Sequence, residues 1–137
     1  MAGDEASRYL AKSLYNHGFA NELQRASEDR IEPFLREAIE LDPTYTDAMS
    51  CLGTLCLRTG RVDEGLGWLG KCTELDPGAG QGWYYQAKHH LGAKDSEKAA
   101  YFAGRAGDAY HAARQYQFEG DARDIEGFAY RDLGKLR

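Results

Sequence analysis

Seven side chains in this sequence are of the types that bind transition metals or act as strong nucleophiles. They are three cysteines and four histidines: Cys51, Cys56, Cys72, His17, His89, His90 and His111. On a helix, Cys51 and Cys56 point about 140° apart and His89 and His90 about 100° apart, so neither pair converges on one ion. Free cysteine packs like a small apolar residue. The sequence therefore predicts reduced, packed thiols and no metal site.

Catalytic arrangements are also missing from the pattern. The serines stand in helical or capping contexts rather than in a nucleophile elbow. Gly65-Leu66-Gly67 and Gly78-Ala79-Gly80 lack the preceding strand of a dinucleotide-binding turn. Asp63 and Glu64 suit the first turn of a helix, where carboxylates complement the helix dipole. We therefore expect neither an enzyme nor a cofactor.

Composition narrows the class of protein further. The 137 residues are 42% hydrophobic and 28% charged, with a net charge of −5, which suits one folded domain rather than a general nucleic-acid binder. No stretch approaches the roughly 20 apolar residues of a membrane span, and the first ten residues are polar and acidic. With an odd number of cysteines, these features lead us to expect a cytoplasmic protein that does not insert into membranes.

A repeated phrase organises the chain. Glu40-Leu41-Asp42-Pro43 returns 34 residues later as Glu74-Leu75-Asp76-Pro77. Such a period is typical of solenoids built from pairs of helices. Within residues 46–79, a first apolar stripe (Met49, Leu52, Leu55, Cys56) and a second (Val62, Leu66, Leu69, Cys72) are separated by a break at residues 59–61. Residues 46–79 are therefore predicted to form a helical hairpin.

The same residues resemble the tetratricopeptide repeat (TPR) family. The spacing is Met49-x2-Leu52-Gly53-x2-Cys56, then Gly65-x3-Leu69, then Pro77, and Trp83-x2-Gln86-Ala87-x2-His90 repeats its first part. Gly53 and Gly65 are expected where the helices of the hairpin cross closely. The resemblance implies an all-α, right-handed superhelical solenoid of three to four antiparallel hairpins with a C-terminal capping helix.

Repeat boundaries are expected within a single domain, residues 1–137. An irregular repeat spans about 4–45, clear repeats span 46–79 and 80–109, and a degenerate repeat or cap spans 110–137. In the irregular repeat the first helix lies within residues 5–24, and Pro33 makes the second helix start late or kink. Residues 96–118 form either one helix or two broken near Gly104 and Gly107. A further break is expected at residues 119–121.

The resemblance places the binding groove on the first helix of each repeat. The candidates for partner binding are Asn16, Arg58, Tyr84, Lys88, Tyr110, Arg114 and Gln117. Cations beside tyrosines suit an extended peptide that carries carboxylates. A solvated helix face with scattered charges is the alternative interpretation of the same residues. Chaperone-tail clamps of the family need Lys and Asn where this chain has Asn16 and Ala20, so that ligand is not expected.

The sequence therefore predicts a protein–protein interaction module: an adaptor, co-chaperone or assembly factor that holds a partner segment, expected to be acidic. The alternative is a self-assembling scaffold, a homo-oligomer joined through its terminal repeats by aromatic residues such as Tyr101, Tyr116 and Phe118. A third interpretation is a non-catalytic accessory subunit of an enzyme.

Overall fold

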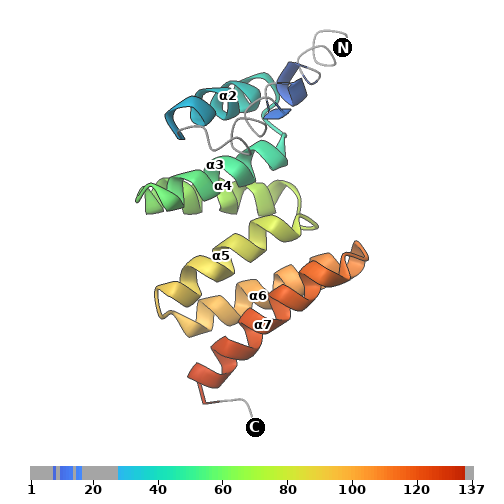
Figure 1. Ribbon diagram of the computed structural model, residues 1–137. Helices are drawn as coiled ribbons and strands as arrows, with labels where there is room; N and C mark the ends of the chain where they lie inside the picture. The colour runs from blue at the N-terminus through green and yellow to red at the C-terminus, as the bar shows by residue number, and fades with distance from the viewer. Residues whose placement is uncertain (1–7, 9, 14, 17–27, 135–137) are drawn as a thin grey trace. The chain divides into compact units, whose positions relative to one another are not determined.

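The described part of the chain is α-helical, with short turns between the helices (Figure 1). The computed structural model describes residues 8, 10–13, 15, 16 and 28–134. It divides into two compact units, Met1–Trp68 and Leu69–Arg137. None of the described helices is both long and apolar enough to cross a lipid bilayer.

The first unit holds α2 (Glu28–Leu41), α3 (Thr46–Arg58) and the start of α4 (Val62–Leu75). α2 lies against α3, and their apolar stripes are buried. The fully buried side chains include Leu35, Met49, Leu52 and Leu55. Pro33 lies inside α2, five residues after its first described residue, so of the two alternatives the late start is wrong and the kink stays a prediction. Tyr9, Leu14 and Phe19, expected in the helix before it, lie outside the described residues.

The repeated Asp-Pro phrase forms the same turn twice. The backbone N–H of Tyr45 donates to the carbonyl of Asp42, and that of Ala79 donates to the carbonyl of Asp76, both at 3.0 Å. Each aspartate side chain also accepts a hydrogen bond from the N–H two residues on, at 3.1 Å in the first turn and 3.0 Å in the second. This Asx-turn geometry explains why the phrase marks the start of each new hairpin.

A second kind of turn joins the helices within a hairpin. The N–H of Arg61 donates to the carbonyl of Cys56, and the N–H of Asp95 donates to that of His90, both at 2.9 Å. In each turn the residue before the donor is left-handed, with φ of 84° at Gly60 and 65° at Lys94. This is the six-to-one hydrogen bond of a Schellman motif, which satisfies carbonyls left free at a helix end.

The second unit contains α5 (Gly80–Gly92), α6 (Ser96–Ala112) and α7 (Tyr116–Asp132), with α6 packed against both neighbours. Small side chains line these contacts: one buried cluster joins Ala87, Ala103 and Ile125, and another joins Ala106, Tyr110 and Ala122. Alanine at a helix contact lets the helix axes approach closely. The unit is therefore held by close helix contacts at alanines, with Ile125 and Tyr110 as the larger side chains of the same clusters.

The chain between α6 and α7 corrects the expected boundaries. α6 runs unbroken through Gly104 and Gly107 to Ala112, so neither the single helix over 96–118 nor the break near these glycines is right. The break lies at residues 113–115, where the N–H of Gln115 donates to the carbonyl of Tyr110 at 2.9 Å and Arg114 has φ of 59°. The break expected at residues 119–121 is wrong, since these residues lie inside α7.

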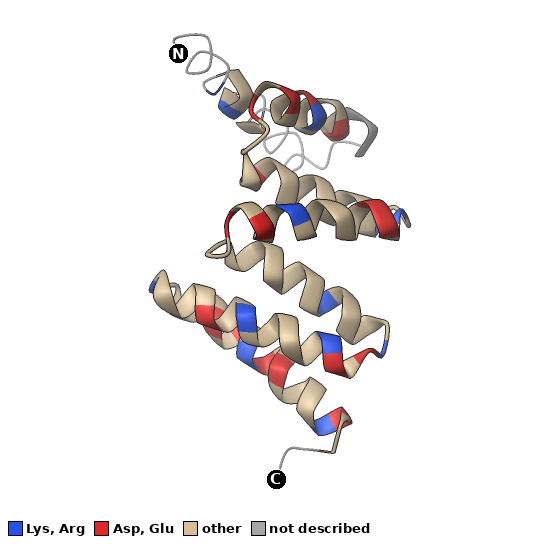
Figure 2. Ribbon diagram, turned by 180° about the vertical axis from the view of Figure 1, so that it is seen from behind, with Lys and Arg blue, Asp and Glu red and all other residues tan. Residues whose placement is uncertain are grey.

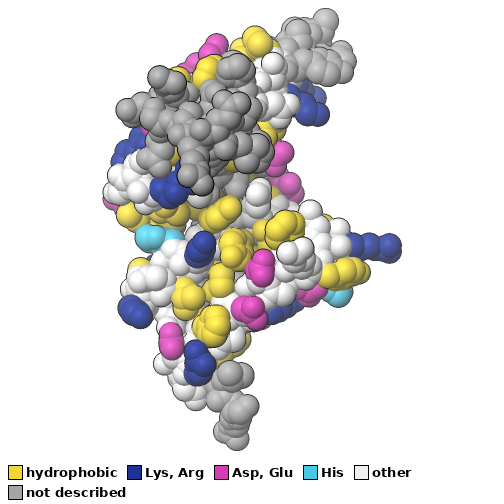
Figure 3. All heavy atoms as spheres, in the orientation of Figure 1, with side chains coloured by type: hydrophobic (Ala, Val, Ile, Leu, Met, Phe, Trp, Pro, Cys, Tyr) yellow, Lys and Arg dark blue, Asp and Glu magenta, His cyan; other side chains and the backbone are white. Residues whose placement is uncertain are grey.

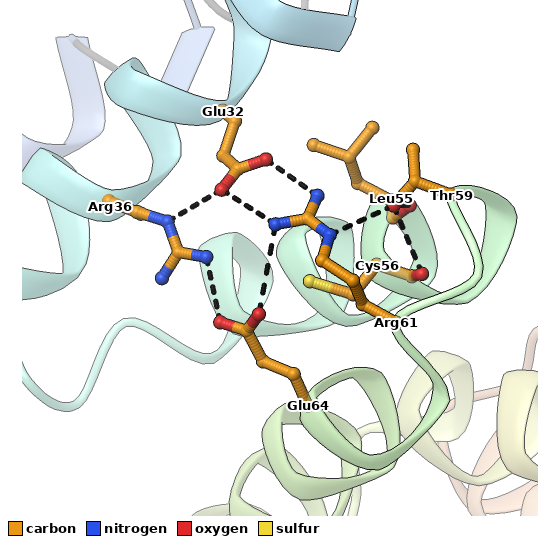
Figure 4. Close-up of polar contacts among 7 residues, drawn as sticks. All are labelled: Glu32, Arg36, Leu55, Cys56, Thr59, Arg61 and Glu64. Atoms are coloured by element: carbon orange, nitrogen blue, oxygen red, sulfur yellow. Dashed lines mark hydrogen bonds and ion pairs between the residues drawn. The ribbon is translucent and has the colours of Figure 1, made fainter.

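A network of four charged side chains ties α2 to the α3–α4 turn and the start of α4 (Figure 4). Arg61 donates to both carboxylate oxygens of Glu32, at 2.6 and 3.0 Å. Arg36 bridges Glu32 at 2.8 Å and Glu64 at 2.7 Å. The hydrogen bonds from Arg61, reinforced by Arg36, lower the pKa of Glu32 to about 2. Bidentate arginine–carboxylate pairs of this kind fix geometry as well as charge.

The packing of α4 on α3 gives the first prediction. A Cβ added at Gly65 would lie 2.8 Å from the carbonyl oxygen of Gly53, whereas one added at Gly67 would meet nothing within 4 Å. Gly65→Ala should therefore lower the free energy of unfolding by about 1–3 kcal/mol through overpacking. Gly67→Ala, the matched control in the same helix, should raise it by up to about 1 kcal/mol. Chemical denaturation measures both, and equal shifts of the same sign would show that the helices do not meet at Gly65.

The second prediction concerns acid stability. The pKa of Glu32 falls from 4.5 to about 2 in the folded protein, so its contribution to stability is complete above pH 4.5 and is lost as the pH drops toward 2. Glu32→Gln should be less stable at neutral pH and should lose less further stability between pH 5 and pH 2. Glu97→Gln, on exposed surface of α6, should keep the wild-type pH slope. Parallel acid profiles for the wild type and Glu32→Gln would contradict this role.

Candidate functional site

The exposed side of α5 carries a narrow strip of polar side chains. Gln81 and Lys88 are both exposed and lie seven residues apart, which places them on one line along the helix. Ala87 and Gln86 are buried on other sides of the same helix. Tyr84 is half-buried beside the strip. α5 thus presents one cation and one amide to solvent.

α7 presents the equivalent strip on its own exposed side. The N-cap residues of α5 and α7 are Ala79 and Gln115, 36 residues apart. At this offset Gln117 corresponds to Gln81 and Asp124 corresponds to Lys88, and both α7 residues are exposed. Asp121 is exposed on the same side of α7, one turn before Asp124. We define the α5/α7 row as five residues: Gln81, Lys88, Gln117, Asp121 and Asp124.

Tyr84 shows that the two strips are neighbours. Its ring packs against the two buried clusters that contain Ile125 and Ala122 of α7. Burial raises the pKa of Tyr84, and the nearby Asp121 carboxylate raises it further. The row therefore places a cation on one helix and two carboxylates on the next, with a tyrosine between them.

The charges of the row differ from those elsewhere in the unit because they make no ion pair with any described residue. In contrast, Arg123 reaches Asp108 at 2.9 Å and Glu126 at 3.3 Å. Basic and acidic residues are interspersed along α6 and α7 (Figure 2). Ion pairs within the unit engage charges such as that of Arg123. Lys88, Asp121 and Asp124 remain available to a ligand.

The structure separates the residues that the sequence proposed for partner binding. Lys88 and Gln117 lie in the row and Tyr84 borders it, all within the second unit. Asn16 and Arg58 are exposed residues of the first unit. Their role in partner binding stays a prediction.

The sequence analysis places Tyr110 and Arg114 on the first helix of a repeat. The structure places them in two different elements. Tyr110 lies near the end of α6, only 5% exposed, and its ring would be 2.5 Å from a Cβ added at Gly80. Burial raises its pKa. Arg114 is exposed in the α6–α7 turn. Tyr110 therefore packs the α5–α6 contact, and Arg114 projects from the end of the hairpin.

Sequence reasoning missed Asp121 and Asp124. A 36-residue offset from α5 finds them only if residues 119–121 are helical, whereas the sequence analysis expects a break there. Within the described residues, no three histidine, cysteine or acidic side chains come together in a way that could hold a metal ion. Cys56 and Cys72 are buried and Cys51 is half-buried, and burial raises the pKa of Cys56.

Comparison with known proteins identifies the fold. No family model matches the chain. A stretch of 46 residues, 34% of the chain, is 41% identical to BBSome complex member bbs-4 of Caenorhabditis elegans, and covers only 10% of that protein. The crystal structure of the MamA protein, which contains TPRs, matches 92% of this chain and 84% of its own with a TM-score of 0.60 and 14% identity. The predicted all-α, TPR-like helical-repeat fold is confirmed.

A prediction follows from the turn that holds Arg114. An L-residue in the left-handed region costs about 1–2 kcal/mol, which glycine avoids at an entropic cost of roughly half that. Arg114→Gly should therefore raise the free energy of unfolding by up to about 1 kcal/mol, whereas Arg114→Ala should leave it unchanged or lower it. Urea titration of the two variants measures this. A loss of stability in Arg114→Gly larger than that in Arg114→Ala would mean that the left-handed backbone at residue 114 is not strained, whereas equal losses in both variants would mean that the arginine side chain stabilises the turn.

Proposed function

We propose that this protein is a protein–protein interaction module that binds an extended partner segment along the α5/α7 row. The observation that carries the proposal is the set of exposed charges in the row, which make no ion pair with described residues. TPR-like helical repeats present such helix faces as binding surfaces, and the bbs-4 relative is named as a member of a protein complex. An adaptor or assembly-factor role fits this surface.

The charges of the row define the partner more closely than the sequence did. An acidic segment alone would pair with Lys88 and meet repulsion from Asp121 and Asp124. Neighbouring packed helices lie about 8–10 Å apart, which an extended chain spans in about three residues. We therefore propose a segment with an acidic residue over α5 and a basic residue about three positions away over α7. Gln81 and Gln117 would bind backbone amides of the segment.

Self-assembly is the second candidate function. Tyr101 and Tyr116 are 58% and 60% exposed, and Phe118 is 51% exposed although its ring lies 5.4 Å from that of Tyr110. Hydrophobic side chains interspersed with charges of both signs are visible on the surface of the second unit (Figure 3). Exposed aromatic residues of this size favour contact with another protein surface.

The prediction for partner binding uses peptides selected from a random display library by the wild-type protein. Lys88→Glu should weaken these peptides by several-fold or more, because repulsion replaces attraction, and so should Asp121→Lys. The effect should shrink with added salt. Selected peptides should carry acidic and basic residues about three positions apart.

Lys98→Glu is the matched control, because Lys98 lies on α6 and its ammonium is 3.9 Å from Asp95 within the same turn. It should leave peptide affinity within about twofold of the wild type, as expected for a screened surface charge. If Lys98→Glu abolished binding while Lys88→Glu and Asp121→Lys did not, the binding surface would be α6 rather than the row.

A further inference from the structure

The outer side of α7 combines an exposed aromatic ring with a hollow in the surface. Phe128 is 47% exposed, and the guanidinium of Arg131 lies 5.2 Å from its ring centroid. A shallow hollow of about 210 Å³ opens over Gly127, which has no side chain to fill it; it is lined by Arg123, Asp124, Gly127, Phe128 and Arg131. A Cβ added at Gly127 would meet nothing within 4 Å. This surface has the mixed apolar and charged character of a docking site.

Two charged residues of this surface form no ion pair within the described part of the chain. Asp124 and Arg131 make no ion pair with another described residue, although Arg123 beside them bonds to Asp108 at 2.9 Å. They lie seven residues apart, which on an α-helix is two turns with a drift of only about 20°. Asp124 and Arg131 therefore lie on one line along α7, one of each sign.

The positions of these residues are symmetric about one point of the helix. Asp124 and Arg131 stand at equal distances on either side of the midpoint between Gly127 and Phe128. A two-fold axis through that point would set α7 antiparallel to α7 of another molecule, with each Asp124 facing the other copy's Arg131. We propose that a second copy of this chain docks on α7 in this way.

The geometry of such a contact is self-complementary. Asp124 and Arg131 are separated by about 10.5 Å along the helix, so the two ion pairs would flank the centre. At the centre the Phe128 rings would meet, while Gly127 lets the two helices approach. An isologous interface needs one patch that is complementary to its own copy after a two-fold rotation, and the α7 surface meets this requirement. A single helix pair buries little area, so we expect a weak, concentration-dependent dimer.

The experiment is sedimentation velocity of the full chain over a range of concentrations. The wild type should shift from the monomer mass of 15.3 kDa toward twice that value. Asp124→Arg alone and Arg131→Asp alone should each weaken association about 10-fold or more, because each variant places two like-charge pairs in the dimer. Phe128→Ala should also weaken it.

Charge exchange separates this interface from a general loss of folding. An equimolar mixture of Asp124→Arg and Arg131→Asp restores both attractive pairs, so the mixture should associate although neither variant does alone. The double variant Asp124→Arg/Arg131→Asp should recover self-association for the same reason. Circular dichroism should show native helix content in all variants.

Two control variants test whether the effect is specific to α7. Glu97→Arg, a charge reversal on exposed surface of α6, and Lys88→Glu, on α5, should both leave self-association unchanged. A wild type that stays monomeric at all concentrations overturns the proposal, and so does a dimer that persists in Asp124→Arg. Failure of Lys88→Glu to alter peptide binding would count against the partner-binding row alone.

Discussion

Close approach between neighbouring helices is the constraint on which the rest of this structure depends. In the first unit, Gly65 faces the carbonyl oxygen of Gly53 at a separation that leaves no room for a methyl group. In the second unit, alanines at 87, 103 and 106 occupy the contacts that α6 makes with its neighbours. Larger side chains fill the space beside these close contacts, as Tyr110 does at 5% exposure, whereas Phe128 lies half-exposed on the surface of α7. The second unit therefore combines close helix contacts inside with aromatic residues exposed at its surface.

The charged residues likewise fall into two groups, those in ion pairs within the chain and those exposed to solvent. Glu32 and Arg61 connect α2 to the α3–α4 turn, and the lowered pKa of Glu32 means that its ionised form favours the folded state. Arg123 has the same role between α6 and α7. The remaining exposed charges of α5 and α7 contribute little to folding, since isolated surface charges are well solvated. Their arrangement is therefore not required for folding, and the binding proposal gives it a role.

The sequence predicts the helices and turns of residues 46–92 well because each boundary has a clear local signal. Asp42 and Asp76 form Asx-turns, and Gly60 supplies the left-handed residue of a Schellman motif. The α6–α7 boundary has neither signal. Arg114 is a good helix former that adopts the left-handed conformation only because the six-to-one hydrogen bond and the packing of both helices require it.

The glycines of α6 misled the prediction for the opposite reason. Gly107 looks like a helix break, yet a Cβ there would lie 2.6 Å from the guanidinium carbon of Arg123. Glycine at this position gives room to the Arg123 guanidinium inside a continuous helix and makes no turn, which no local pattern reveals. The expected break at residues 119–121 would divide α7, so the sequence analysis does not place its carboxylates opposite Lys88. The missed part of the candidate site therefore follows directly from one missed turn.

Asp124 connects the two proposals made for α7. It belongs to the α5/α7 row, and it is also the acid of the proposed α7–α7 contact. One carboxylate with a single exposed side cannot pair with a partner's basic residue and with Arg131 of a second copy at the same time. The two equilibria are then linked, so that self-association at high concentration reduces the apparent affinity for the partner segment, and the segment dissociates the dimer to the same thermodynamic extent. A weak dimer of this kind would cover α7 when no partner is present and release it when one binds.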